Sequence, residues 1–419
     1  MRRFILIILT GVLFCQGLSG AEWKAGFSQW RMERALDALE EFAGEIEDIR
    51  EINGNMYYAA LCKRINSYGR EIIPLMLRDL EDKGKDWKYR YMLVDRLVFV
   101  KGKTSADQWE ICRVLLRLLE DRKEKRELRS NVIDGLSRLA GSSSRMDDRK
   151  RVRVMEELLK IADNDGEGHR IRWEVIRDLS RFAKYDTILL EPMLRLSEEA
   201  DRDMRAISIS NLVTIAHFTH NEFIKSRIKS VLVDRLQVEQ DDLVKEQIIY
   251  GIKTLKVREA IPLLMESLRD GRYCSRAQAA ELLGIMKVRE AVPLLIEGLK
   301  DNTPSMLRYE AALALGKIGD KRAVEPLINI LNTGSSSAAA RALGMLGDKR
   351  AVKPLMELLE REGYDPRTVE ALIRLDAREA IPLIEEKMPK GKKLYGSEAE
   401  IKDKFERFKR GENIDWEEK

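Results

Sequence analysis

The feature that most constrains the fold of this chain is a short sequence that occurs five times between residues 258 and 388. Each copy starts with alanine and an isoleucine or valine, and a proline and a leucine follow at once or one position later. The copies begin at Ala260, Ala291, Ala323, Ala351 and Ala380, so successive starts are 31, 32, 28 and 29 residues apart. A near-constant period of this size is typical of a solenoid, in which each repeat buries its apolar face against its neighbours.

Each copy predicts the first of two helices. Its proline falls in the first helical turn, where the missing N–H removes no hydrogen bond. A second helix rich in alanine and glycine follows, for instance over residues 277–284, and its small side chains allow neighbouring helices to approach closely. Gly319 and Gly347 stop two of these second helices, and Asp320 and Asp348 are placed to cap the helices that follow.

The Ala-Val-x-Pro-Leu opening and the Ala-Leu-Gly-x-x-Gly-Asp ending resemble HEAT repeats of the short bacterial kind, which also occurs in phycobilin lyases. The resemblance is specific from Arg258 to about Leu375. It implies an all-α fold, a right-handed α-solenoid of about nine HEAT-like helix pairs with capping helices. Such a fold has an extended concave face that is suited to gripping a partner.

Upstream of residue 258 the helical periodicity continues with longer repeats. We expect helix pairs to begin near Arg70, Ala106, Asp147, Thr187 and Asn221, with starts 34 to 41 residues apart. A capping box at Ser397–Glu400 predicts a final helix to about residue 409. The predicted organisation is a signal peptide (1–21), a helical cap (22–66), diverged longer repeats (67–257), regular short repeats (258–388), and a capping helix with a tail (389–419).

The first residues resemble a secretory signal peptide. Arg2 and Arg3 precede an apolar run over residues 4–14, and small residues at 19–21 suit cleavage near Glu22. The run is too short to span a bilayer comfortably. We therefore expect an exported protein, periplasmic or secreted. The alternative is an uncleaved anchor, in which case this segment alone would contact a membrane.

Charge and cysteine content limit the functional classes. The chain has 75 Lys and Arg against 71 Asp and Glu, interleaved, for a net charge of +4. Such a balance gives no electrostatic argument for nucleic acid or an anionic membrane. Beyond the signal segment, Cys62, Cys112 and Cys274 lie far apart in helical patterns, so we expect buried thiols rather than disulfides or a zinc site.

No motif in the chain carries enzyme chemistry. It lacks a phosphate-binding loop, a Gly-x-Ser-x-Gly elbow and a His-Glu-x-x-His pair. His217 and His220 are spaced so that one helix face could present both to a metal, but no third ligand is evident, and surface histidines are the alternative. Residues 163–167 resemble the start of a calcium-binding loop but lack its full ligand spacing, and this favours a polar turn. We expect no catalytic residues, no metal and no cofactor.

One set of arginines could contact either a partner or the neighbouring repeats. Arg276 and Arg308 open equivalent second helices, and Arg367 lies close to the corresponding place further on. HEAT repeats commonly carry an Asp and an Arg at the spacing of Asp270 and Arg276, which form a polar ladder between repeats. Asn302 takes the place of the Asp for Arg308. The resemblance therefore implies ladder positions, with partner binding as the alternative.

These observations favour an exported, non-catalytic scaffold that binds a protein partner through its concave surface, and not nucleic acid. Two other classes stay open. One is a tetrapyrrole-handling enzyme similar to phycobilin lyases, which the export signal disfavours. The other is a HEAT-like nucleic-acid-binding protein, which the balanced charge disfavours.

Overall fold

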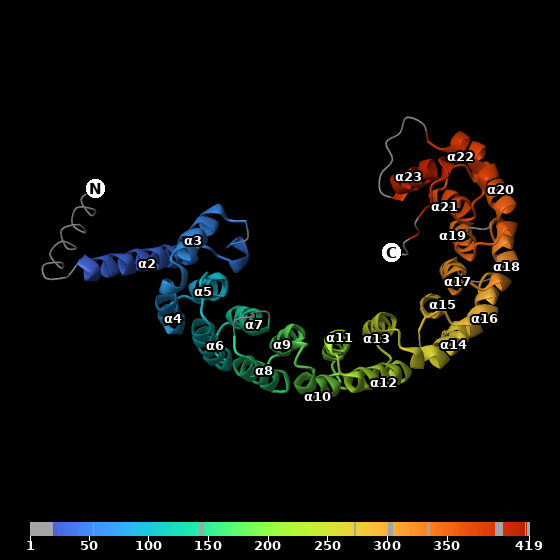
Figure 1. Ribbon diagram of the computed structural model, residues 1–419. Coiled ribbons are helices and arrows are strands. Elements are labelled where there is room, and N and C mark those ends of the chain that lie inside the picture. Colours follow the sequence, from blue (N-terminus) through green and yellow to red (C-terminus); the bar gives the residue numbers. More distant parts are fainter. Residues whose placement is uncertain are drawn as a thin grey trace. The chain divides into compact units, whose positions relative to one another are not determined.

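A computed structural model describes residues 20–52, 54–141, 146–271, 274–300, 305–332, 336–389, 397–414 and 416. Over these residues the secondary structure is helical throughout, with turns between helices, so the all-α prediction is confirmed. The chain divides into two compact units, residues 1–224 and 225–419, and each is described by itself (Figure 1). Residues 1–19 of the predicted signal segment lie outside the described residues.

The first unit begins with two helices, α2 (Gly20–Glu45) and α3 (Met56–Ser67). Four helix pairs follow: α4 (Ile73–Glu81) with α5 (Trp87–Phe99), α6 (Ser105–Glu120) with α7 (Arg126–Gly141), α8 (Asp148–Ala162) with α9 (His169–Leu179), and α10 (Asp186–Leu196) with α11 (Arg202–Phe218). The observed starts of α6, α8 and α10 fall within one residue of the predicted ones. The weaker periodicity of this half therefore predicted its repeats correctly.

The second unit contains the regular repeats. Its pairs are α12 (Glu222–Val238, which spans the division) with α13 (Asp242–Leu255), α14 (Ile261–Asp270) with α15 (Arg276–Ile285), α16 (Val292–Glu297) with α17 (Ser305–Ile318), α18 (Val324–Asn329) with α19 (Ser336–Leu346), and α20 (Val352–Glu362) with α21 (Pro366–Arg374). The helices α22 (Ile381–Lys387) and α23 (Ser397–Lys409) complete the unit. In the part of the chain that the structure describes, the first unit has four helix pairs after α2 and α3 and the second has five before α22 and α23, which agrees with the predicted total of about nine.

The repeated alanine ends a short 3-10 turn ahead of each first helix. Ala260, Ala291, Ala323, Ala351 and Ala380 are all completely buried. Because these alanines are completely buried, a larger side chain at the end of the 3-10 turn would have to displace its neighbours. The constancy of this residue in the sequence is therefore a packing requirement of the turn.

Second helices of the second unit approach one another closely. An added Cβ on Gly284 would lie 2.6 Å from Cα of Ala314, and one on Gly316 would lie 2.8 Å from Cα of Ala342. Gly344 meets Ala371 in the same way, at 2.8 Å. These glycine–alanine contacts bring α15, α17, α19 and α21 together along the inner side of this unit's curve (Figure 1).

The C-terminal end of the stack is covered by α23, which packs on α21. Phe405 and Phe408 of α23 are buried, and the guanidinium of Arg378 lies 4.0 Å from the centre of the Phe408 ring. Cys62, Cys112 and Cys274 are buried free thiols, as predicted from the helical patterns in which they lie. Among the described residues, no helix is both long enough and apolar enough to span a bilayer.

Candidate functional site

Three buried arginines join the helices of the first unit. Arg90, Arg129 and Arg172 occupy the first turns of α5, α7 and α9, and their exposed fractions are only 3%, 5% and 9%. In each, Nε donates a hydrogen bond to a carbonyl oxygen ten residues earlier, at the end of the first helix of the same pair. The acceptors are Leu80 at 2.8 Å, Leu119 at 3.2 Å and Ala162 at 2.8 Å.

Each of these arginines also reaches a glutamate of the following repeat. Glu124, Glu167 and Glu199 lie in the turns between the two helices of those repeats, with shortest N–O distances of 2.8, 2.7 and 2.5 Å. The hydrogen bonds from Arg129 hold the pKa of Glu167 below its ordinary value. The predicted polar turn at residues 163–167 is confirmed, and it supplies one partner of this ladder.

The ladder in the first unit was missed by the sequence analysis. The available signal was an arginine in the first turn of a second helix and a glutamate in the next inter-helix turn. That glutamate comes 34, 38 or 27 residues later, a variable spacing that hides the pattern.

The structure separates the three arginines that the sequence grouped. Nε of Arg276 donates to the carbonyl of Leu268 at 2.9 Å, which is the same contact within a repeat that the ladder arginines make. Arg308 is half-buried in the first turn of α17. Arg367 is exposed, donates to Oγ of Ser337 at 3.2 Å, and lines a groove. Asn302 lies outside the described residues.

This groove runs along the inner side of the second unit and has a volume of about 1130 Å³. Its walls come from the second helices of successive repeats, from the C-cap of α13 to α21, and from α23. We call it the inner groove. The groove could not be predicted from the sequence, because its walls come from residues up to 148 positions apart that only the stacking brings together.

Four cations of the inner groove have side chains without a partner among the described residues. In the described part of the chain, the side chains of Lys256, Lys287, Lys317 and Arg341 make no ion pair and no hydrogen bond, and they come from four successive repeats. Nearer the C-terminal end, Arg367 donates to Ser337, and two other cations form ion pairs. Arg374 contacts Glu370 at 2.9 Å, and Lys404 contacts Glu400 at 2.8 Å.

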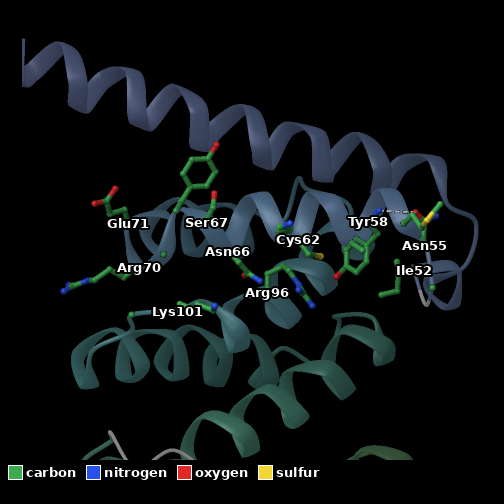
Figure 2. Close-up of a pocket in the computed structure, with 17 residues that line it drawn as sticks. Ile52, Asn55, Tyr58, Cys62, Asn66, Ser67, Arg70, Glu71, Arg96 and Lys101 are labelled. Atoms are coloured by element: carbon green, nitrogen blue, oxygen red, sulfur yellow. Dashed lines mark hydrogen bonds between the residues drawn. The ribbon is translucent and has the colours of Figure 1, made fainter.

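A second cavity, of about 1090 Å³, lies in the first unit between α3 and α5 (Figure 2). The hydroxyl of Tyr58 donates to Asp95 at 3.2 Å, and the guanidinium of Arg96 lies 5.6 Å from the centre of the Tyr58 ring. Burial raises the pKa of the nearby Cys62 thiol. Tyr58, Asp95 and Arg96 already contact one another, so this cavity is a weaker candidate for a binding site than the inner groove.

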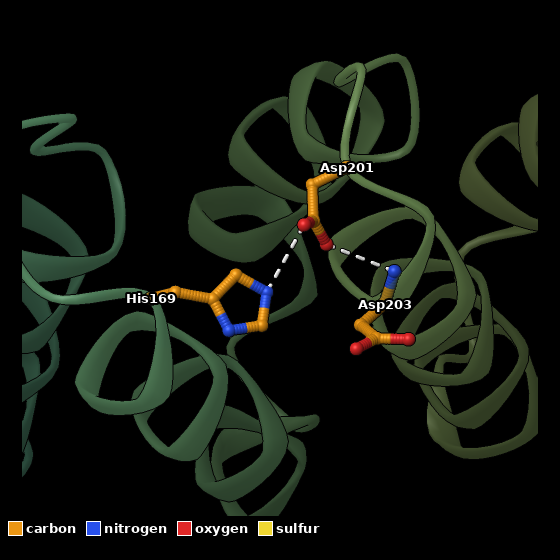
Figure 3. Close-up of side chains that lie close together, drawn as sticks. All are labelled: His169, Asp201 and Asp203. Atoms are coloured by element: carbon orange, nitrogen blue, oxygen red, sulfur yellow. Dashed lines mark hydrogen bonds and ion pairs between the residues drawn. The ribbon is translucent and has the colours of Figure 1, made fainter.

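One histidine lies beside two aspartates (Figure 3). Nε2 of His169 is 3.1 Å from Oδ2 of Asp201, and Asp203 is adjacent. Asp201 is also the N-cap of α11 and accepts the backbone N–H groups of Asp203 and Met204. Burial alone would raise the pKa of Asp201, but the Met204 N–H and His169 hold it below its ordinary value. Helix capping accounts for this cluster.

The other two histidines do not share a helix face. His217 lies in the last turn of α11, where its ring meets that of Phe218 edge-on, and His220 lies beyond the end of the helix. Both are exposed. The structure thus gives them the surface and helix-end positions that were the alternative to a shared metal.

Comparison with known proteins identifies the repeats of the second unit and shows a shared fold. The sequence profile described as HEAT repeats matches residues 228–314, 275–338 and 306–375. No curated protein matches the sequence.

Several karyopherins share the fold. Kap95p, from a structure with RanGDP, has a TM-score of 0.64 at 12% identity, over 95% of this chain and 57% of its own. Kap121p has a TM-score of 0.59 at 11% identity, over 90% and 46%, and importin beta 0.58 at 13%, over 83% and 54%. The chain spans about half the length of these proteins. Residues 228–375 are therefore HEAT repeats, and the helix pairs of the described chain share the fold of the karyopherins.

Proposed function

We propose that this protein is an exported, non-catalytic scaffold that holds a protein partner in the inner groove of its second unit. The observation that carries the proposal is the set of four unpaired cations in that groove. In contrast, arginines in the first turns of second helices, such as Arg129 and Arg276, bond to carbonyls or carboxylates within the stack. Cations whose side chains make no ion pair or hydrogen bond within the described residues, and that share one concave surface, are suited to an external partner.

Similar folds support a protein as that partner. Kap121p is known in structures bound to the C-terminus of the phosphatase Cdc14p and to Nup53p. This support is an analogy at the level of the fold, so the groove itself must carry the proposal. Export rests on the apolar run at residues 4–14, and the non-catalytic role rests on the missing sequence motifs.

Site-specific cross-linking in the native host tests the proposal. A photo-reactive residue replaces Met345, which lines the inner groove, and the matched control replaces Met356 on α20, a first helix. We expect one or a few envelope proteins to cross-link through position 345 only, on a chain that starts near Glu22. Cytoplasmic proteins or nucleic acid captured on a chain that retains Met1, or equal capture from both positions, would contradict the proposal.

A further inference from the structure

We infer that the inner groove binds an acidic, extended polypeptide segment with a carboxylate at about every third residue. The inference rests on the proposed function and adds the chemistry of the partner. It starts from Lys256, Lys287, Lys317 and Arg341, whose side chains are unpaired within the described residues.

The four cations form one oblique row. Lys256 and Lys287 are equivalent residues, each just after the end of a second helix. Lys317 lies two residues before the corresponding position Gly319, and Arg341 lies six residues before Gly347, so the row shifts along the helices from repeat to repeat. Packed helices lie about 8–10 Å apart, so the row spans roughly 30 Å. An extended chain advances about 3.3 Å per residue, so about nine residues cover the row and every third one meets a cation.

Backbone strain at two of these residues also points to a ligand. Lys256 and Lys287 have φ of 48° and 54°, a left-handed conformation that glycine adopts at the equivalent Gly319 and Gly347. A cation near a helix C-terminus gains a little from the helix dipole. The turn forms its backbone capping hydrogen bonds, but within the described residues neither lysine side chain makes an ion pair or hydrogen bond that would offset the rest of the strain. Lysine at these places instead puts an exposed ammonium group into the groove.

The distribution of charge favours a polypeptide over nucleic acid. At the C-terminal end of the groove, Asp365, Glu370, Glu398 and Glu400 lie beside Arg367, Arg374 and Lys404. The row of cations is therefore a basic section of limited length beside one that has no excess of cations. A nucleic acid carries a phosphate at every nucleotide and would gain no net attraction beyond the row. A peptide can carry carboxylates over one stretch only.

Fluorescence anisotropy with labelled peptides tests the inference on the full chain. The probe is a 12-residue peptide, (Glu-Gly-Ser)4. The controls are (Gln-Gly-Ser)4, a peptide of the same composition with its four glutamates clustered, and a 12-nucleotide oligothymidine. We expect the spaced glutamate peptide to bind, to weaken as salt is added, and to bind at least tenfold more tightly than the glutamine peptide.

Variants assign that binding to the row of cations. The pair K317E and R341E should weaken binding at least tenfold, and the pair K256G and K287G at least threefold without loss of folding. The pair K321E and K349E, at exposed lysines of the 3-10 turns ahead of α18 and α20, is the matched control and should bind as wild type. Circular dichroism checks that every variant is folded.

Three outcomes overturn the inference: no binding of the spaced peptide, equal binding of the glutamine peptide, or no effect of K317E and R341E. Tighter binding of oligothymidine than of any peptide would assign the row to nucleic acid instead. Cross-linking through position 345 separates this inference from the proposed function. If the variant with all four cations replaced still captures the partner, the acidic segment is wrong and the scaffold stands. If wild type captures no protein there, the proposed function itself fails.

Discussion

At the scale of single residues, five equivalent positions in the second unit share a left-handed backbone but differ in identity. They are Lys256, Lys287, Gly319, Gly347 and Asp376, with φ between 48° and 79°. The conformation is needed at each because the second helix must end there and turn toward the next 3-10 turn. Glycine adopts this conformation without strain. A lysine at the same place therefore introduces a charge but lowers the stability of the fold.

Replacing these lysines by glycine should therefore stabilise the second unit. We expect K256G and K287G each to raise the free energy of unfolding by about 0.5–1 kcal/mol, the relieved strain less the entropy of a glycine. Urea unfolding measures this as a higher midpoint at an unchanged slope. The reverse control, G319A or G347A, should lose about 1 kcal/mol. Lower stability of both glycine variants would refute the strain argument.

Asp320 and Asp348 should make the stability of the second unit depend on pH. Side-chain hydrogen bonds from Arg322 and Arg350 lower the pKa of each to about 2, from an ordinary value of 3.8. A carboxyl whose pKa is lower in the folded state stabilises the fold above its ordinary pKa, and this is lost as pH falls toward 2. We expect D320N/D348N to be less stable than wild type at pH 7 and the difference to shrink between pH 4 and pH 2. Urea unfolding across this range checks it, and a difference independent of pH would contradict it.

At the scale of helices, the two units join their second helices differently. The second unit uses contacts of glycine on alanine, such as Gly316 against Ala342, which the run of small residues predicted. The first unit uses buried ion pairs such as Arg129 with Glu167. Small residues recur within one helix and are visible in the sequence. An ion pair joins residues from two repeats of unequal length, so the sequence alone does not align the partners.

Adding one methyl group at a glycine tests whether the close glycine–alanine contacts stabilise the second unit. G316A places a Cβ 2.8 Å from Cα of Ala342, and backbone atoms have little freedom to move away. We expect a loss of about 1–3 kcal/mol in the free energy of unfolding. The matched control is G44A on α2, where nothing lies within 4 Å of the added Cβ, and it should cause no loss. Equal effects of the two changes would rule out close helix approach as the reason for the glycine.

A double-mutant cycle tests whether the buried ion pair of Arg129 and Glu167 stabilises the first unit. R129M leaves buried Glu167 with only a longer contact of 3.6 Å to the exposed Arg122, and should cost about 2–4 kcal/mol, most of which R129M/E167M should restore. The control is K160M, which removes a more exposed contact with Glu157 and should change stability by less than about 1 kcal/mol. Additive losses at Arg129 and Glu167 would mean that the two side chains are not coupled.

At the scale of the whole molecule, the sequence predicted the repeats better than the surface they form. The buried alanines and helix stops marked the second unit, and periodicity placed α6, α8 and α10. The inner groove could not be predicted in this way, because its row of cations occupies different helical positions in successive repeats. The same limit explains why Arg276 and Arg367 were grouped, although only Arg367 lines the groove.

Because each repeat packs mainly on its neighbours, a lesion should act locally. G316V, larger than the alanine change, should lower amide protection in α15, α17 and α19, which flank the clash, and leave α5, α7 and α9 of the first unit unchanged. Hydrogen exchange read by mass spectrometry resolves these helices. R129M should give the mirror result, with protection lost in α7 and α9 and kept in the second unit. If either variant lowered protection in both units equally, the molecule would unfold as one cooperative body, and stability would not be a sum over neighbouring repeats.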